Sequence, residues 1–217
     1  MYKDSYKDKG LRKKLVEELR QKGISSSKVL NAIDAIPRHT FFELALMQHA
    51  YVDKAFPIGN GQTISQPYTV AYQTEQLDIQ MGDKILEIGT GSGYQAAVLS
   101  KLHIELHTIE RHLALSKKAK THLNKLGIKN IKYYCQDGTL GLEKEAPFNK
   151  IIVTAGAPIA PQALLKQLAI KGILIIPIGS NSKQIMTKFT RINENKITKE
   201  TLGTFSFVPL IGKEGWS

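Results

Sequence analysis

The sequence has almost no cysteine. Cys135 is the only one in 217 residues, which excludes an intrachain disulfide. Paired cysteines and an H-E-x-x-H pattern are missing and the six histidines are scattered, so we expect no bound metal. No run approaches the roughly 18 apolar residues of a membrane span, and the first ten residues, MYKDSYKDKG, lack the apolar core of a signal peptide. These absences predict a cytoplasmic protein with no membrane partner.

Acidic residues are also in the minority, with 19 Asp and Glu against 30 Lys and Arg and a net charge of +11. Residues 111–132 contain no acid and are rich in lysine. Such a stretch can bind nucleic acid, or it can be the solvated face of an amphipathic helix. Helical spacing favours the second interpretation, because one stripe is apolar and comprises Leu115, Ala119, Leu123 and Leu126. We therefore expect no stable nucleic-acid partner.

Periodicity divides the chain into a helical part and an α/β part. Leu11, Leu15 and Leu19 recur every fourth position before Gly23, and a second apolar stripe stops at Pro37. From residue 84, short apolar strands at 84–88, 105–109, 131–135, 150–153 and 172–178 alternate with helices at 94–102, 113–126 and 161–169. Two β-rich segments, 184–192 and 202–210, flank the polar turn NENK and predict a closing hairpin.

This order predicts an α/β, Rossmann-like fold. We expect a mostly parallel twisted sheet of about seven strands with helices on both faces, an antiparallel C-terminal hairpin and an N-terminal helical cap. Nothing in the sequence marks a domain boundary, so we expect one domain over residues 1–217. Residues 1–70 would form the cap and an active-site loop, and residues 84–217 a cofactor-binding sheet with a C-terminal β extension.

The strand at 84–88 runs into a glycine-rich turn, GTGSGY (89–94). Alternating glycines allow a ligand to approach the backbone closely at a helix N-terminus. The spacing, which begins at Glu87, is E-x-G-x-G-x-G, whereas a dinucleotide fingerprint would have glycine where Tyr94 stands. A carboxylate at the strand end suits a cationic ligand better than a pyrophosphate.

Two further carboxylates follow the next two strands. Glu110 comes 21 residues after Gly89, at the offset where an acid accepts ribose hydroxyls, and Asp137 precedes Gly138 at a position suited to an adenine amino group. Together these features fit S-adenosyl-L-methionine better than NAD or ATP. Alternatively, Glu110 and Asp137 are helix caps or turn formers.

Longer motifs identify a family. They are IPRHTFF (36–42), AYVDKAFPIGNGQTISQP (50–67), ILEIGTGSGYQAAVLS (85–100), YCQDG (134–138), FNKIIVTAGAP (148–158), LLKQLAIKGILIIPIG (164–179) and FVPLIGKEGW (207–216). In these segments the chain closely resembles the protein-L-isoaspartate O-methyltransferases. The glycine loop is shared by many methyltransferases, whereas GNGQTISQP and VTAGAP are specific to this family.

The resemblance implies a class I methyltransferase that uses S-adenosyl-L-methionine. Its substrates would be proteins and peptides with damaged L-isoaspartyl residues, whose free carboxylate is methylated to begin repair. The resemblance leaves open whether D-aspartyl residues are a second acceptor. Relatives suggest a monomer. The catalytic residue would be Ser65, and substrate would bind at Thr63, Ser65 and Val208. The predicted cofactor-binding residues are Thr63, Ile64, Glu87, Gly89, Gly91, Ser92, Glu110, Arg111, Asp137 and Gly138.

Two positions leave alternatives open. Ser65 stands just before Pro67, so it can also cap a helix that begins there. Ser206 stands where many bacterial relatives have arginine, and Arg111 and Arg191 are candidates to replace that arginine.

The competing functions are an RNA methyltransferase, which the positive charge favours, and a cofactor-binding module without catalysis. The chain lacks the N/D-P-P-[YF] motif of the former, and the intact site residues argue against the latter.

Overall fold

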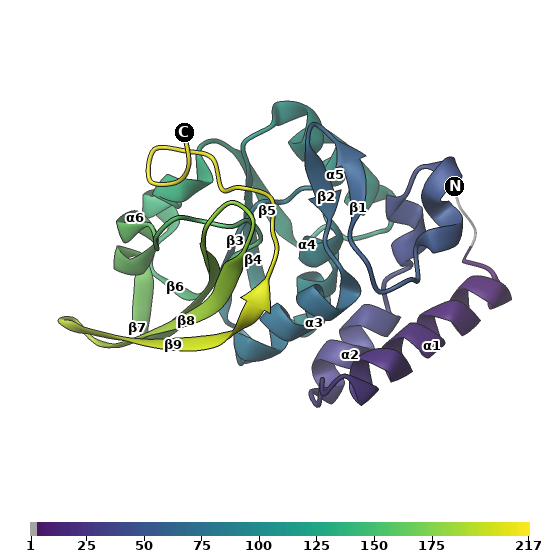
Figure 1. The fold of residues 1–217 in the computed structure, drawn as a ribbon, viewed down its shortest axis with the longest axis horizontal. Coiled ribbons are helices and arrows are strands. Elements are labelled where there is room, and N and C mark those ends of the chain that lie inside the picture. The colour runs from purple at the N-terminus through teal and green to yellow at the C-terminus, as the bar shows by residue number, and fades with distance from the viewer. Residues whose placement is uncertain (1–3) are drawn as a thin grey trace.

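A seven-stranded sheet forms the centre of the molecule, in the order β5-β4-β3-β6-β7-β8-β9 (Figure 1). The computed structural model describes residues 4–217. The strands are β3 (Lys84–Ile88), β4 (Glu105–Glu110), β5 (Ile131–Cys135), β6 (Phe148–Val153), β7 (Leu168–Gly179), β8 (Gln184–Asn193) and β9 (Lys196–Phe205). β3 to β7 pair in parallel, and β8 and β9 add an antiparallel hairpin. The predicted α/β sheet with its closing hairpin is confirmed.

The sheet separates two apolar cores because successive side chains of a strand point to opposite faces. In β3, Ile85 packs with the N-terminal helices, whereas Leu86 and Ile88 pack on the other face with α6 (Gln162–Lys166). The first core includes residues of α1 (Tyr6–Gln21), α2 (Ser27–Asp34), α3 (Pro67–Gln76), α4 (Tyr94–Leu99) and α5 (Leu113–Lys125). Helices therefore cover both faces, and the carboxyl ends of β3, β4 and β5 meet at one edge of the sheet.

The lysine-rich segment forms α5, and its amphipathic interpretation is confirmed. Leu115, Ala119 and Leu123 are buried and Leu126 is half-buried, while the lysines at 117, 118, 120 and 125 are exposed. Within residues 4–217, no helix combines the length and apolar character that a membrane crossing requires.

The segment between the helical cap and the sheet contains more regular secondary structure than the predicted loop. The 3-10 helices η1 (Arg38–Phe41) and η2 (Leu44–His49) precede an antiparallel hairpin of β1 (Phe56–Gly59) and β2 (Gln62–Ile64). Gly59, Asn60 and Gly61 all have positive φ, which makes the tight turn possible. The predicted active-site loop is thus largely a β-hairpin, followed directly by α3.

The second strand of the C-terminal hairpin has other bounds than those predicted. Its second strand was expected at 202–210, but β9 spans Lys196–Phe205. Most of this edge strand is polar and exposed, so its first half has no hydrophobic signature. After Phe205 the chain leaves the sheet edge, and Pro209 pairs with Gly156 instead. The helix expected at 161–169 is also shorter, because β7 begins at Leu168.

Candidate active site

The glycine loop after β3 is tightly packed against Thr154, the residue that follows β6. Gly89, Gly91 and Gly93 all have positive φ, with values of 98°, 51° and 87°. A Cβ at Gly89 would lie only 2.4 Å from the Thr154 hydroxyl oxygen, so only glycine fits there. The Thr154 hydroxyl in turn donates to the Gly89 carbonyl oxygen at 2.8 Å. The loop is therefore held in one shape before any ligand binds.

The carboxylate of Glu110, at the end of β4, is hydrogen-bonded to the backbone of this loop. One of its carboxylate oxygens accepts the Gly91 N–H at 2.8 Å and the other accepts the His112 N–H at 2.9 Å. Its side chain is 6% exposed. A carboxylate has about four acceptor positions, so Glu110 keeps one free on each oxygen for a ligand diol. Its contacts within the loop are therefore compatible with the predicted role as a ribose acceptor.

Asp137, after β5, ties the C-terminal segment to the same edge. Its Oδ1 accepts from the Thr139 N–H at 2.9 Å and from the Thr139 hydroxyl at 2.7 Å, and its Oδ2 accepts from the Lys213 N–H at 2.8 Å. Partial burial opposes ionisation, but these hydrogen bonds outweigh it and hold the pKa of Asp137 below its usual value. Asp137 is therefore a turn former, as the alternative interpretation expected, and it anchors the chain end.

A groove runs along this edge as two adjoining cavities that share Gln62, Gly89, Glu110 and Ala155. The first also reaches Gly91, Ser92, Thr63, Ser65, Thr154 and Val208. The second also reaches Ile109, Arg111, Gly138 and Leu210. The groove thus extends from the β1–β2 hairpin, past the Glu110 carboxylate, to the turn after β5.

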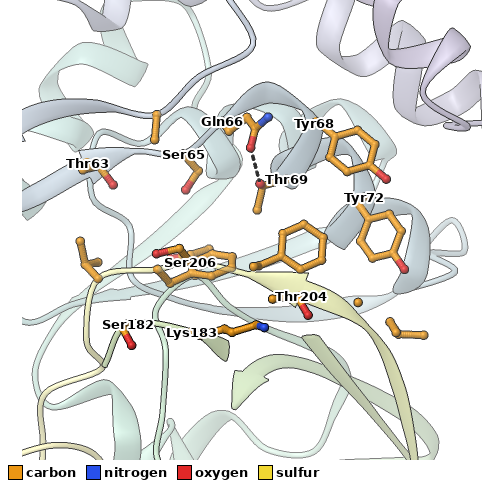
Figure 2. A pocket seen from close by; sticks show the side chains of 17 residues that line it. Thr63, Ser65, Gln66, Tyr68, Thr69, Tyr72, Ser182, Lys183, Thr204 and Ser206 are labelled. Carbon is orange, nitrogen blue, oxygen red and sulfur yellow. Dashed lines mark hydrogen bonds between the residues drawn. The ribbon is translucent and has the colours of Figure 1, made fainter. Parts of the chain in front are cut away.

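A larger cavity, of about 1110 Å³, opens beside the groove (Figure 2). One wall comes from β2 and α3, and the other from β9, the segment after it and the β7–β8 turn. The large cavity and the groove meet at residues that line both, namely Thr63, Ser65, Thr154 and Val208. A ligand in one space can therefore touch a ligand in the other at this junction.

Ser65 lies at the junction with its hydroxyl available. The N-cap of α3 is Gln66, so Ser65 is not the helix cap that the alternative interpretation expected. Within residues 4–217 the Ser65 hydroxyl makes no hydrogen bond, whereas its carbonyl oxygen accepts from Arg38 at 2.9 Å. The backbone of Ser65 is thus anchored while its side chain is free to bind a ligand.

Three predicted cofactor residues, Ile64, Glu87 and Asp137, do not line the groove. Ile64 is 1% exposed in the core beside α3. Glu87 is fully buried, with one oxygen accepting from the Thr108 hydroxyl and the other unpaired within the described chain. Burial, opposed by the Thr108 hydrogen bond and assisted by nearby Glu110, raises the pKa of Glu87 to about 8. At neutral pH Glu87 is mainly a protonated carboxyl inside the sheet and does not face a cationic ligand.

The two arginines considered in place of Ser206 also lie elsewhere. Arg111 lines the Gly138 end of the groove, and Arg191 donates to the carbonyl oxygens of Lys166 and Leu168. The large cavity has Lys183 instead. Sequence reasoning missed Gln62, Thr154 and Ala155 as well, although all three stand inside the motifs GNGQTISQP and VTAGAP.

Two side-chain groups among residues 4–217 have the spacing of metal ligands, and both lie apart from the groove. They are Asp4–Asp8–His39 and Glu105–His107–Glu145. In each group one carboxylate already forms an ion pair with a neighbouring cation. Arg12 lies 3.0 Å from Asp4, and Lys132 lies 2.7 Å from Glu105. These cations reduce the negative charge that would attract a metal.

Comparison with known proteins places this site in a family. The family model described as protein-L-isoaspartate(D-aspartate) O-methyltransferase matches residues 10–215. Protein-L-isoaspartate O-methyltransferases of Cytophaga hutchinsonii and Flavobacterium psychrophilum are each 53% identical to the chain. The alignments cover 99% of this chain and 96% of the former, and 96% of this chain and 98% of the latter. The chain belongs to the protein-L-isoaspartate O-methyltransferase family.

Solved structures of protein-L-isoaspartate O-methyltransferases share the fold. One has a TM-score of 0.83 at 28% identity, covering 94% of this chain and 67% of its own. A second, from Plasmodium falciparum in complex with S-adenosyl-L-homocysteine, has a TM-score of 0.81 at 27% identity, covering 92% of this chain and 98% of its own. The predicted family, the class I methyltransferase fold and the L-isoaspartyl carboxyl methyltransferase activity are confirmed.

Proposed function

We propose that the methyl transfer of this family takes place at the junction between the groove and the large cavity. The observation that carries the proposal is the set of residues shared by both spaces: Thr63, Ser65, Thr154 and Val208. The groove would hold the methyl donor and the large cavity the isoaspartyl peptide. Donor and acceptor would then meet beside Ser65.

The groove fits S-adenosyl-L-methionine, the cofactor whose demethylated product is bound in the Plasmodium falciparum relative. Glu110 has free acceptor positions for the two ribose hydroxyls. Gly138 packs closely against Ile88, since a Cβ there would be 2.5 Å from it, and both residues line, with Ile109, the end of the groove where the adenine ring would lie. The cofactor supplies a methyl group on a sulfonium, which is an electrophile.

The residues of this chain are suited to positioning rather than to proton transfer. An isoaspartyl α-carboxyl has a pKa of about 3.5–4 and is already ionised at neutral pH, so no general base is needed. The Ser65 hydroxyl would donate to one carboxylate oxygen and direct the other toward the methyl group. A neutral donor serves here because a close cation would lower the nucleophilicity of the carboxylate. Alignment of this kind corresponds to an effective concentration of about 10⁵ M or more.

The peptide would lie across the large cavity, with its backbone against the segment around Val208. In this proposal the enzyme acts as a monomer in the cytoplasm on isoaspartyl proteins and binds no nucleic acid stably. Acceptance of D-aspartyl residues stays a prediction.

The test is transfer of labelled methyl groups from S-adenosyl-L-methionine to three matched peptides that contain L-isoaspartyl, L-aspartyl or D-aspartyl at one position. We expect strong labelling of the isoaspartyl peptide, none of the L-aspartyl peptide, and loss of the label in alkali because carboxyl methyl esters hydrolyse. Bulk RNA is the control acceptor. Equal labelling of the first two peptides, or alkali-stable label on RNA, would contradict the proposal.

A further inference from the structure

The large cavity contains one charged side chain. Of the residues that line it, all within the described part of the chain, Lys183 alone carries a charge, and none is acidic. Across residues 4–217 its ammonium group makes no ion pair or hydrogen bond. A cavity with a single unpaired cation attracts anionic ligands and repels cationic ones.

The backbone of Lys183 is held in place by the β7–β8 turn. The Ser180 N–H donates to the Lys183 carbonyl oxygen at 3.0 Å, and the Lys183 N–H donates to the Ser180 hydroxyl at 3.2 Å. A Cβ at Gly179 would lie 2.4 Å from that carbonyl oxygen, so the turn packs closely. The lysine therefore extends from a defined point of the cavity wall.

Lys183 and Ser65 belong to opposite walls. In Figure 2, Lys183 lies with Ser182, Thr204 and Ser206 on the wall formed by the β7–β8 turn and the end of β9, and Ser65 lies with Thr63 and Gln66 on the other. Ser206, which stands where many bacterial relatives have arginine, lines this cavity, and neither Arg111 nor Arg191 does. Lys183 is thus the cation that this chain presents to its substrate.

An anion bound by Lys183 would be a second one, distinct from the reacting carboxylate. The reacting carboxylate must lie at the junction beside Ser65, and a paired ammonium there would weaken it as a nucleophile. The cavity, at about 1110 Å³, has room for residues on either side of the isoaspartyl. We propose that Lys183 binds the side-chain carboxylate of a flanking Asp or Glu and selects isoaspartyl peptides with an acidic neighbour. This inference rests on the proposed function.

The experiment compares kcat/KM for matched isoaspartyl peptides in which the two positions before and the two after the isoaspartyl carry Gln, Glu or Lys in turn. At one of these positions we expect Glu to raise kcat/KM about three- to five-fold over Gln, mainly through KM, and Lys to lower it. The difference should shrink between about 50 mM and 500 mM salt because screening weakens an ion pair in an open cavity.

Variants assign the preference to this side chain. Lys183→Gln should remove the difference between Glu and Gln peptides, and Lys183→Glu should make the Lys peptide the better substrate. Lys199→Gln, an equal loss of charge on exposed β9 outside the cavity, is the matched control and should keep the wild-type preference.

The outcomes separate this inference from the proposed function. If the wild-type enzyme methylates all peptides equally, or if Lys183→Gln keeps the preference, the inference is overturned while methylation of the Gln peptide still supports the function. If the Gln peptide is not methylated at all, both are overturned.

Discussion

The buried guanidinium of Arg38 donates a hydrogen bond to the carbonyl oxygen of Ser65, with 2.9 Å between Nη2 and the oxygen. Arg38 also donates to the Ala50 carbonyl oxygen at 2.9 Å and lies over the Tyr94 ring, 4.5 Å from its centroid. Its side chain is fully buried. The position of the proposed catalytic serine is therefore set by a residue that precedes it by 27 positions and packs against the first helix after the glycine loop.

We expect Arg38→Lys to lower kcat while leaving S-adenosyl-L-homocysteine affinity nearly unchanged. Lysine keeps the charge, but a single ammonium cannot reproduce the planar fork that reaches both carbonyl oxygens. A carbonyl left unpaired in this buried site costs about 1–3 kcal/mol, so the midpoint of thermal unfolding should also fall. Kinetics below the unfolding transition, together with calorimetry of product binding, would measure both effects. A folded variant with wild-type kcat would show that Ser65 does not depend on this contact.

We expect Ser65→Ala to bind the cofactor product normally and to methylate isoaspartyl peptide at least about 100-fold more slowly. The estimate is the loss of one transition-state hydrogen bond in a preorganised site. Ser27→Ala changes the same atoms at an exposed position outside the cavities and should behave as wild type. Steady-state kinetics at saturating peptide give the answer, and unchanged turnover would remove the positioning role of Ser65.

We expect Asp137→Asn to weaken S-adenosyl-L-homocysteine binding about tenfold. Asparagine can still accept from Thr139, but its amide N–H₂ would then face the Lys213 N–H, so two donors would oppose each other. The C-terminal segment would lose its anchor beside Gly138, and its cleavage by protease should accelerate. Glu143→Gln, on an exposed 3-10 helix, is the control for loss of one acid. Wild-type affinity in a calorimetric titration would exclude Asp137 from the adenine end.

We expect Glu87→Gln to flatten the pH dependence of stability. Burial raises the pKa of Glu87 to about 8 from an ordinary value of 4.5. Between these values the unfolded carboxyl has lost its proton while the folded one keeps it, so the folded state binds more protons and stability falls as pH rises. The variant cannot titrate at this position. Its free energy of unfolding relative to that of the wild type should therefore rise with pH, by at most about 1.4 kcal/mol per pH unit in this window.

The measurement for Glu87 is urea unfolding at pH 5, 6.5 and 8, with Glu143→Gln again as the exposed control. A constant difference between Glu87→Gln and wild type at the three pH values would show that Glu87 does not stay protonated in the fold.

Much of this architecture follows from local patterns. The short apolar runs at 84–88 and 105–109 predicted strands of one mostly parallel sheet, and the carboxyl ends of parallel strands share one edge of a sheet. That rule alone brings the glycine loop and Glu110 together, as the structure confirms. The β1–β2 hairpin and the first half of β9 lacked a detectable signature because neither shows a strongly apolar alternation.

The sequence by itself determined the family, the sheet and the candidate residues, because those depend on residue types at fixed spacings along the chain. Tertiary structure decided which candidates share a surface. It buried Glu87 inside the sheet, left the Ser65 hydroxyl free by making Gln66 the helix cap, and placed Lys183 across the cavity from Ser65. Spacing carries no information on these points, since each depends on how segments far apart in the chain pack against one another.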